Sequence, residues 1–352
     1  MPITEFRARD FRCLEDARLE LDPHYNLIAG PNASGKTSLL EALAYLGRGR
    51  SFRGAQTPNL IRHGASEFVL FGRVQRSGKT TTIGVRNSRD GLEVKVDGEA
   101  DGGAAALAEA LPLQVIDPDV HNLVSGGPEE RRRFLDGIAF HVEHDFLAAW
   151  RRFRRALKQR NAALKAGGRG LEAWNAEFIE LGQIIDTARR AVLEVCLDSL
   201  EEQAQALLGA ELRFEYRSGW SPDKSLADAL SESLERDRQL GSTQVGPHRA
   251  DIRLVYDQQQ ARRLVSRGQQ KLLAASMIIA ATEIVQTHLE RPMLLLLDDP
   301  AAELDIDSLA RLLSQVYALG CQVVATSLDP EALIFPADPA VFHVEQGRVS
   351  SA

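Results

Sequence analysis

The chain has 352 residues and is 44% hydrophobic, which is enough for one large or two moderate domains with a sizeable core. The formal net charge of −7 excludes a uniformly basic protein, so any contact with nucleic acid must come from a local basic surface. Three scattered cysteines without a C-x-x-C pair, and no apolar stretch near the ~20 residues that span a bilayer, predict a reduced cytoplasmic protein without zinc or a membrane partner.

The first 117 residues or so are predicted to be rich in strands. Apolar and β-branched runs alternate there with glycine and polar turns, which is the pattern of short strands. The candidate strands are Ile3–Arg9, Ala17–Leu21, Tyr25–Ala29, Phe68–Val74, Thr80–Val85, Leu92–Val96 and Leu113–Ile116.

A phosphate-binding motif follows the strand Tyr25–Ala29. Its spacing is G-x-x-x-x-G-K-[ST], and leucines at helical spacing come after it, so it has the strand–loop–helix context of a P-loop. The backbone N–H groups of such a loop form an anion nest at a helix N-terminus, which favours the phosphates of ATP. We expect Lys36 to reach the β- and γ-phosphates and Thr37 to ligate Mg²⁺, the alternative being a chance glycine-rich turn. The predicted nucleotide-binding residues here are Gly30, Pro31, Asn32, Ala33, Ser34, Gly35, Lys36, Thr37 and Ser38.

Residues 126 to about 240 are predicted to form a helical arm. Pro128 stands at a first helical position, with Glu129 and Glu130 in the first turn. Two longer helices then keep apolar residues three and four apart, which predicts a short coiled-coil-like hairpin with its turn at 167–170. The apolar positions are Phe146, Trp150, Phe153, Leu157 and Leu164 in the first helix, and Leu171, Trp174, Phe178, Leu181, Ile185, Ala188, Val192 and Val195 in the second.

One surface of this arm is predicted to be strongly basic. Residues 131–169 contain eleven Lys or Arg residues against three Asp or Glu residues, which is the footprint expected for DNA phosphates. The alternative is a solvated face bridged to acids elsewhere. No aromatic base-reading motif accompanies the charges, so we expect sequence-tolerant and salt-sensitive binding. The candidate DNA-binding residues are Arg131, Arg132, Arg133, Arg151, Arg154, Arg155 and Lys158.

After the arm the chain returns to a strand, Ile252–Tyr256, and then to an apolar helix over Leu272–Val285. Ser266 is the expected N-cap of that helix. The run 264–271 resembles the signature motif of ABC-type ATPases, in which the helix N-terminus closes on the γ-phosphate held by a partner protomer. An ordinary capped helix start is the alternative. The signature residues are Ser266, Arg267, Gly268 and Gln269.

An acidic strand completes the expected site. The apolar run Met293–Leu297 predicts a buried parallel strand that delivers carboxylates at its C-terminal edge. P-loop enzymes need an acid there, so we expect Asp298 to hold Mg²⁺ and Asp299 to orient or deprotonate the attacking water. A solvated turn after a strand is the alternative. With Lys36 and Ser266, Asp299 makes up the predicted catalytic set.

Two features follow the acidic strand. Glu303 and Asp305 resemble the D-loop of ABC ATPases. The next expected strand, 321–327, ends in Thr326 and Ser327, where many ABC ATPases have a phosphate-sensing histidine. These two residues weaken the case for a phosphate sensor at this position.

Over nearly its whole length the chain resembles the RecF family, with the matching motifs in the same order. The combination of G-P-H-R with S-R-G-Q-Q-K is the most specific part of the likeness. The segments that carry it are Phe11-Arg12, Gly30–Thr37, Ser51–Arg53, Arg131–Asp136, Lys158–Asn161, Gly246–Asp251, Ser266–Lys271 and Asp298–Asp305.

The resemblance implies an α/β fold in which residues 1–125 and 241–352 form an ABC-type, SMC-like ATPase head and residues 126–240 an inserted helical arm. It also implies an ATP-dependent homodimer that binds DNA at single-strand/double-strand junctions or gapped duplex. Such proteins act in the cytoplasm, on the nucleoid, with RecR and RecO to help load recombinase at single-strand gaps. By the same analogy Arg12 contacts the nucleotide; a surface arginine at a strand end is the alternative.

Two residues depart from the commoner pattern. Ala33 stands where many relatives have glycine, and a positive φ there would cost alanine on the order of 1 kcal/mol, so we expect a negative φ. Asp299 stands where many ABC ATPases have glutamate, and its shorter reach predicts slow hydrolysis, below the ~10 s⁻¹ of a median enzyme.

Three other functions compete with this interpretation. The chain could be the ATP-binding subunit of a transporter, although 230 residues between Lys36 and Ser266 exceed what a compact transporter head requires. A long-coil SMC or repair protein is excluded by the short hairpin. The third option is a DNA-binding scaffold that keeps ATP as a static ligand.

Overall fold

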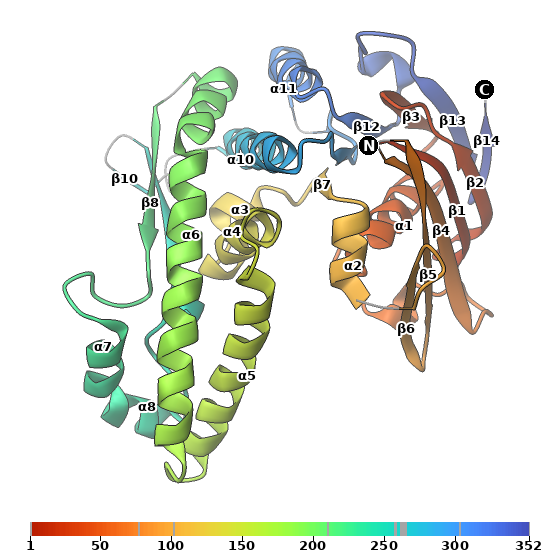
Figure 1. The fold of residues 1–352 in the computed structure, drawn as a ribbon. Helices are drawn as coiled ribbons and strands as arrows, with labels where there is room; N and C mark the ends of the chain where they lie inside the picture. Colours follow the sequence, from red (N-terminus) through yellow and green to blue (C-terminus); the bar gives the residue numbers. More distant parts are fainter. Residues whose placement is uncertain are drawn as a thin grey trace. The chain divides into compact units, whose positions relative to one another are not determined.

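The computed structural model describes residues 2–76, 78–100, 103–209, 211–256, 259–260, 266–302 and 304–351 (Figure 1). The chain divides into two compact units, unit 1 from 1–120 and 290–352 and unit 2 from 121–289. Residues 241–289 thus belong to unit 2, whereas the sequence analysis places them in the head together with residues 290–352. They group with the helical unit because α10 (Arg267–Leu289) packs along α6 (Leu171–Leu208) and α4 (Pro128–Val142). That this segment takes part in the function of an ATPase head stays a prediction.

The main sheet of unit 1 has six strands in the order β14-β13-β3-β12-β11-β7. All neighbouring pairs are parallel except β13 with β14, which confirms the predicted parallel core. A parallel sheet is covered on both faces, which is why its strands are almost continuously apolar; all four residues of β11 are buried. The strands are β3 (Tyr25–Ala29), β7 (Leu113–Ile116), β11 (Leu294–Leu297), β12 (Gln322–Ser327), β13 (Ala340–Glu345) and β14 (Arg348–Ser351).

A second sheet of unit 1 is antiparallel, in the order β2-β1-β4-β5-β6. Buried residues alternate with more exposed ones along β5, as expected when one face of a sheet packs on a core. The predicted strands of this region are confirmed, with small shifts of their ends. They are β1 (Ile3–Phe11), β2 (Leu14–Glu20), β4 (Glu67–Arg76), β5 (Lys79–Ser88) and β6 (Gly91–Val96).

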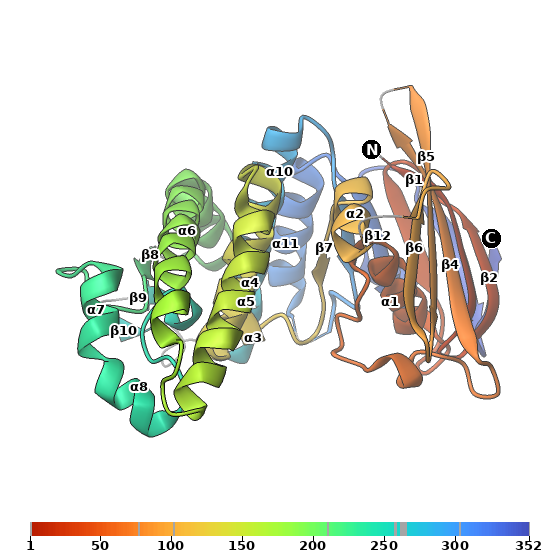
Figure 2. The ribbon, with the colours of Figure 1, turned by 60° about the horizontal axis from the view of Figure 1, so that its bottom comes forward.

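Helix α1 (Lys36–Arg48) joins the two sheets into one core, because it packs against strands of both (Figure 2). Tyr45 of α1 makes edge contacts with the rings of Phe11 and Phe68. Gly47 permits the close approach of β7, since a Cβ there would lie 2.5 Å from the side chain of Leu113. The other helical segments of unit 1 are η1 (Thr57–Asn59), α2 (Gly103–Ala110), α11 (Ile306–Ala318) and η3 (Pro330–Ala332); the sequence pattern does not predict α2.

The predicted hairpin of unit 2 consists of α5 (Phe146–Lys165) and α6, which pack against each other. Gly167, Gly168 and Gly170 all have positive φ in the turn, which explains the glycine run there. Helices α3 (Asn122–Ser125) and α4 precede the hairpin. The helical prediction for this stretch is therefore confirmed.

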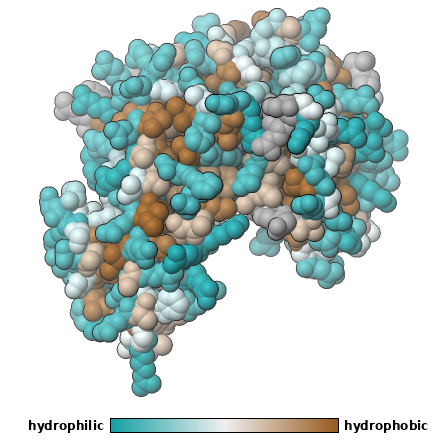
Figure 3. Space-filling view, viewed as in Figure 1, coloured by the Kyte–Doolittle hydropathy of each residue, from teal (hydrophilic) through white to brown (hydrophobic). Residues whose placement is uncertain are grey.

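The buried stripe of α6 departs from the prediction at its C-terminal half. Val195 is 59% exposed, whereas the neighbouring Cys196 is fully buried. Beyond Ala188 the buried stripe runs through Val192, Cys196, Leu200 and Ala204, because a 3.6-residue helix drifts relative to a 3.5-residue repeat and α6 there also packs against α10. Hydrophobic residues gather on the surface over α6 in the view of Figure 3, and Ile184 is also exposed.

The expectation of continuous helix to residue 240 is wrong at β8 (Leu212–Arg217). This strand pairs antiparallel with β9 (Asp251–Tyr256), which in turn pairs with β10 (Gln259–Gln260). β8 has a strand's alternating burial, but its pattern is only six residues long and its partner lies far away in sequence, so local periodicity could not distinguish it. Helices α7 (Leu226–Glu232) and α8 (Leu234–Leu240) follow β8 as predicted.

Helix α10 corrects a further expectation. By length and composition alone it could span a membrane, the one such helix in the described part of the chain. However, 67% of its most apolar window is buried inside the protein, as in the core helix of a soluble fold. Its apolar residues therefore serve the packing of unit 2.

The Gly246–Arg249 segment is a turn that leads into β9 through the short helix η2 (Pro247–Arg249). Gly246 has a φ of 126°, and a Cβ there would lie 2.7 Å from the ring of Phe178. His248 lies beside that ring, and its Nε2 is 3.0 Å from the carbonyl oxygen of Thr243. Its Nδ1 is buried without a partner, and burial lowers the pKa of His248 to about 4.

We expect His248 to make unit 2 sensitive to acid. Its folded-state pKa of about 4 lies below the ordinary 6.5, so the unfolded chain binds the proton more readily and stability falls as the pH drops from 6.5 towards 4. The loss at pH 4 should be on the order of 1–3 kcal/mol. His248→Gln should flatten this part of a plot of unfolding midpoint against pH.

His144→Gln is the matched control, because it makes the same substitution at an exposed histidine. Equal slopes for the His248 variant and the unchanged protein between pH 6.5 and 4 would contradict this account.

Candidate functional site

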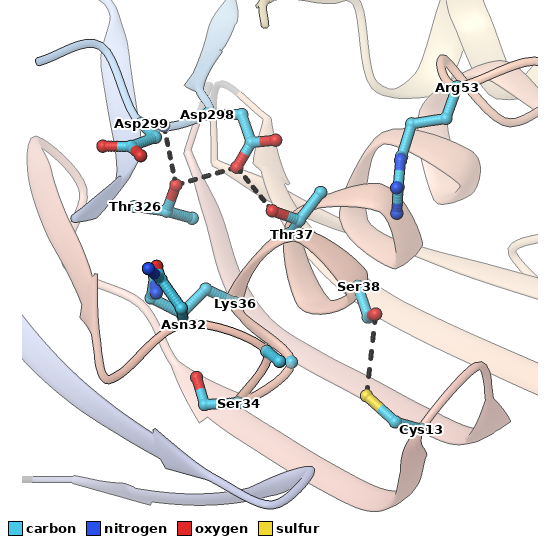
Figure 4. Close-up of a pocket in the computed structure, with 12 residues that line it drawn as sticks. Cys13, Asn32, Ser34, Lys36, Thr37, Ser38, Arg53, Asp298, Asp299 and Thr326 are labelled. Carbon is cyan, nitrogen blue, oxygen red and sulfur yellow. Dashed lines mark hydrogen bonds between the residues drawn. The ribbon is translucent and has the colours of Figure 1, made fainter. Parts of the chain in front are cut away.

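The phosphate loop connects β3 to α1 at the carboxyl edge of the parallel sheet, where ligands of open α/β folds bind. Gly35 is the N-cap of α1 with a φ of 116°, which a side chain would strain. The Nζ of Lys36 donates to the carbonyl oxygens of Gly30 (2.7 Å) and Pro31 (2.9 Å). The ammonium therefore lies over the loop, within reach of an anion held by it. The pocket is lined by Cys13, Asn32, Ala33, Ser34, Gly35, Lys36, Thr37, Ser38, Arg53, Asp298, Asp299 and Thr326 (Figure 4).

Asp298 links the phosphate loop to the acidic strand. Its Oδ1 accepts hydrogen bonds from the hydroxyls of Thr37 (3.0 Å) and Thr326 (2.9 Å), which come from α1 and β12 (Figure 4). Burial raises the pKa of Asp298, while the two hydroxyl donors act in the opposite direction. The structure thus brings Lys36, Thr37 and Asp298 into one pocket, as the motif spacing predicts.

Thr37 and Asp298 fit a magnesium ion. Mg²⁺ prefers oxygen ligands and is usually bound by one or two protein groups together with substrate phosphates and water. A hydroxyl and a carboxylate already in hydrogen-bond contact supply such a pair. No group of three or more His, Cys, Asp or Glu side chains is arranged for a metal within the described residues.

Asp299 has a backbone conformation that is unusual for a residue with a side chain, with a φ of 48°. Its N–H donates to the hydroxyl of Thr326 (2.9 Å), which holds this turn in place. Its carboxylate points away from that of Asp298 in Figure 4. The two adjacent acids are thereby directed to different parts of the pocket, and only Asp298 bonds to Thr37 among the described contacts.

The expectation for Ala33 is wrong. Its φ is 60°, in the left-handed region that glycine adopts most easily. The strain of an L-residue there is on the order of 1 kcal/mol. The neighbouring loop contacts, including Ser34 N–H to the carbonyl of Pro31, outweigh it.

Arg12 lies outside the lining of the pocket. Its Nε and one terminal nitrogen donate to the two carboxylate oxygens of Glu41, each at 2.9 Å, and the other terminal nitrogen donates to the carbonyl of Asn59. Like Asp299, Arg12 has a positive φ, of 56°. A contact between Arg12 and a nucleotide remains a prediction.

Three pocket residues were missed by sequence reasoning: Cys13, Arg53 and Thr326. The sequence marks Thr326 only as the place of an absent histidine, and its hydroxyl nevertheless donates a hydrogen bond to Asp298. Arg53 belongs to the segment Ser51–Arg53, which resembles the RecF family but to which the sequence analysis assigns no role. The thiol of Cys13 lies 3.6 Å from the hydroxyl of Ser38, a contact that no sequence pattern announces.

The signature helix α10 begins with a reciprocal cap. The N–H of Gln269 donates to the hydroxyl of Ser266 (3.3 Å), and the N–H of Ser266 donates to the side-chain oxygen of Gln269 (2.8 Å). This is a capping box, so the predicted N-cap is confirmed. Ser266 is exposed. Residues 264 and 265 of the predicted motif lie outside the described residues.

Of the D-loop residues, Glu303 lies outside the described residues. Asp305 is the N-cap of α11, and its carboxylate accepts hydrogen bonds from the backbone N–H (2.9 Å) and hydroxyl (2.7 Å) of Ser308. These bonds lower the pKa of Asp305. Ile306, the next residue, is 86% exposed.

The candidate DNA-binding arginines of α4 are engaged within the protein. Arg131 is 4% exposed; it pairs with Asp251 and donates to three backbone carbonyls. Arg132 donates to the carbonyl of Ala250. Arg133 is exposed but pairs with two acids in the first turn of its own helix, three and four residues before it. Arg131 must therefore be removed from the predicted basic surface.

The cations of α5 are arranged differently. Arg151, Arg154, Arg155 and Lys158 are all exposed, at helical spacings of three and four that place them on one face. Arg154 lies over the ring of Trp150, 4.8 Å from its centre. Within the described part of the chain, the other three have no ion-pair partner.

A mainly parallel sheet with a phosphate loop and an acidic strand end at its carboxyl edge defines the class of P-loop proteins, here in the form of an ATPase head with a helical unit between its two chain segments. The RecF/RecN/SMC N terminal domain family matches residues 2–348. The chain is 39% identical over 357 residues to the DNA replication and repair protein RecF of Edwardsiella ictaluri (strain 93-146), covering 99% of this chain and 100% of that protein. It belongs to the RecF family.

Two further comparisons agree. The chain is 40% identical over 361 residues to the RecF protein of Chromohalobacter salexigens, covering 99% of each. A solved structure of the recombination mediator protein RecF with ATP, described as acting in the RecFOR pathway, aligns with a TM-score of 0.90 at 26% identity, over 100% of this chain and 97% of that one. The SMC-like head fold expected from the sequence is thus confirmed.

We expect Ala33→Gly to stabilise the protein, because glycine adopts the φ of 60° without strain. The gain should be on the order of 0.5–1 kcal/mol, since relief of strain is partly offset by the greater freedom of glycine in the unfolded chain. The midpoint of the thermal unfolding transition measures it.

Ala44→Gly in α1 is the control, as the same chemical change inside a helix should destabilise by ~1 kcal/mol or more. A lower midpoint for both variants would show that strain at Ala33 does not limit stability.

Proposed function

We propose that this chain binds ATP with Mg²⁺ in the phosphate-loop pocket and, in that state, forms a symmetric homodimer on DNA. The observation that carries the proposal is the hydrogen bond between Thr37 and Asp298, which unites the loop with the acidic strand in one site. Membership of a family of DNA replication and repair proteins, with a similar protein solved with ATP, supports the choice of ligand.

Five side chains of the pocket have a defined task in this scheme. The ammonium of Lys36 exchanges its bonds with two loop carbonyls for phosphate oxygens, while the loop N–H groups bind the β-phosphate. Thr37 and Asp298 would hold Mg²⁺, which neutralises charge on the terminal phosphates when bound. Asp299 orients or deprotonates the attacking water. Thr326 holds both acids in place through its hydroxyl.

The signature segment of a second copy would close the site. Ser266 is exposed at the N-terminus of a helix, where N–H groups and the helix dipole favour an anion. With one nucleotide in each copy, both sites contribute to an isologous contact. Loss of the γ-phosphate on hydrolysis removes the interaction that favours the closed dimer. We expect this hydrolysis to be slow and to serve as a release switch.

DNA would contact the exposed cations of α5. Three of them, Arg151, Arg155 and Lys158, have no partner among the described residues and so keep their charge available for phosphates. We further propose that the chain acts in the cytoplasm, on the nucleoid, at single-strand gaps. There it would help load recombinase together with RecR and RecO, in line with a relative described in the RecFOR pathway.

Two alternatives give different results in simple assays. A non-hydrolysing scaffold would bind ATP and DNA but release no phosphate in a single turnover. A transporter subunit would lose stimulation by DNA and gain it from membrane extract; the family relationship argues against this option.

We expect Lys36→Ala to abolish both nucleotide binding and ATP-driven dimerisation, because it removes the cation that faces the phosphates. Asp299→Asn should keep binding but slow dissociation of the dimer, since it removes only the group that activates water. Light scattering with ATP, with ADP and without nucleotide measures the dimer, with and without gapped duplex.

A monomeric Asp299→Asn variant in excess ATP and Mg²⁺ would count against the scheme. Turnover above ~10 s⁻¹ by the unchanged protein would contradict slow hydrolysis.

We expect substitution of Arg151, Arg155 and Lys158 by alanine to weaken binding to DNA by the same factor whatever the DNA sequence. For each cation that binds a DNA phosphate, its removal should reduce the slope of log affinity against log salt by about 0.9. Arg152→Ala is the control on the same helix, because Arg152 already pairs with Glu177. An unchanged salt slope in the triple variant would remove α5 from the DNA-binding surface.

A further inference from the structure

Helix α6 carries an apolar stripe on its exposed face. Ile184 is 42% exposed and Val195 is 59% exposed. Eleven residues are close to three helical turns, so the two side chains lie on one line of the helix, about 16 Å apart. The half-buried Ala191 lies on the same line between them. We term Ile184, Ala191 and Val195 the α6 stripe; it belongs to the hydrophobic surface over α6 in Figure 3.

Carboxylates surround the α6 stripe and leave it strongly negative. From Ala191 to Gly209 the chain has no Lys or Arg. The acids of α6 that form ion pairs in the described part of the chain are Glu177 and Asp186, and both lie before the acidic half of the helix. The exposed acids along the stripe, which have no ion-pair partner among the described residues, are Glu180, Glu194, Asp198 and Glu202.

Helix α10 adds a fifth exposed carboxylate beside the stripe. The hydroxyl of Ser199 donates to Glu283 of α10 at 2.6 Å, which links the two packed helices at the surface. Ser199 lies one turn beyond Val195 on α6, so Glu283 borders the stripe. No Lys or Arg occurs in α10 after Lys271, so this helix brings no compensating charge to the surface.

The chemistry of this surface limits what can cover it. DNA is repelled by the unpaired carboxylates. A second copy of the chain offers exposed cations on α5, but the apolar residues Phe153 and Ala156 of that helix are buried, so it has no free apolar face. Carboxylates that lose water beside an apolar partner need cations opposite them. The complementary partner therefore combines apolar residues with Lys or Arg.

We propose that the α6 stripe and its five carboxylates form a docking surface for an amphipathic helix of another protein, whose apolar face is flanked by Lys or Arg. Apolar residues at i, i+4, i+7 and i+11 of such a helix would cover the distance from Ile184 to Val195. The flanking cations would pair with the carboxylates and fix the orientation of the helix. Protein and DNA would then occupy different helices of one arm, α6 and α5. This docking does not depend on nucleotide.

The test measures binding of a labelled synthetic helical peptide by fluorescence anisotropy. The probe has leucine at i, i+4, i+7 and i+11 and lysines along both flanks of that face. We expect micromolar binding at low salt. Val195→Ser and Ile184→Ser should each weaken it about fivefold or more, because each removes apolar area that the peptide buries. Leu240→Ser is the matched control, since Leu240 is 56% exposed but lies on α8.

The charge requirement is tested separately. Glu194→Gln combined with Asp198→Asn should weaken binding about tenfold at low salt and flatten its dependence on salt, because it removes two of the carboxylates that face the lysines. Asp223→Asn combined with Glu235→Gln is the matched control, as it removes equal charge at other exposed positions of unit 2. A peptide with glutamate in place of every lysine should not bind. Unchanged unfolding midpoints show that the variants are folded.

Three results would overturn the proposal. The first is no binding of the lysine peptide to the unchanged protein at low salt. The second is equal affinity of Val195→Ser and the unchanged protein, which would reduce the interaction to attraction by net charge. The third is self-association of the unchanged protein without nucleotide that Val195→Ser abolishes, which would assign the stripe to a second copy of the chain.

Discussion

The hydrogen bonds of one carboxylate organise the site. Asp298 accepts from Thr37 at the start of α1 and from Thr326 at the end of β12, so three segments far apart in sequence meet at one oxygen. This is possible because β3, β12 and β11 are adjacent and parallel, with registers that bring their carboxyl ends to one edge. The geometry of the pocket is therefore a property of the sheet, and the loop only supplies the anion nest.

Two residues of the pocket carry backbone strain. Ala33 and Asp299 adopt positive φ, as Arg12 does outside the pocket lining, and this conformation costs L-residues on the order of 1 kcal/mol. Two of these residues direct a side chain: Arg12 towards Glu41, Asp299 away from Asp298. Such strain persists only where surrounding contacts determine the conformation, and here hydrogen bonds to Thr326 and to Glu41 do so. The pocket is thus preorganised before any ligand binds.

The sequence predicts what is encoded locally. The phosphate loop, the acidic strand and the cap at Ser266 have short motifs with fixed spacing, and all were found as expected. Glu41 and Thr326 escaped notice because their importance lies in partners that only tertiary structure supplies. The φ of Ala33 was mispredicted because the prediction assumed that the loop backbone would adopt the conformation that alanine prefers. The conformation of the loop prevailed, since its contacts outweigh a penalty of ~1 kcal/mol.

The number of basic residues in a sequence segment also overstates the positive charge that its surface presents to DNA. Residues 131–169 hold a local excess of basic residues, yet Arg131 directs its guanidinium to Asp251 and to carbonyls, and Arg160 is buried against Asp237. These arginines stabilise unit 2 and cannot release counterions from DNA. What remains is the short row of exposed cations on α5, within a protein of net charge −7. Few phosphate contacts give weak, salt-sensitive attachment. In the proposed dimer, two copies joined around nucleotide would double the row, and the proposed DNA binding would then strengthen without any change in α5 itself.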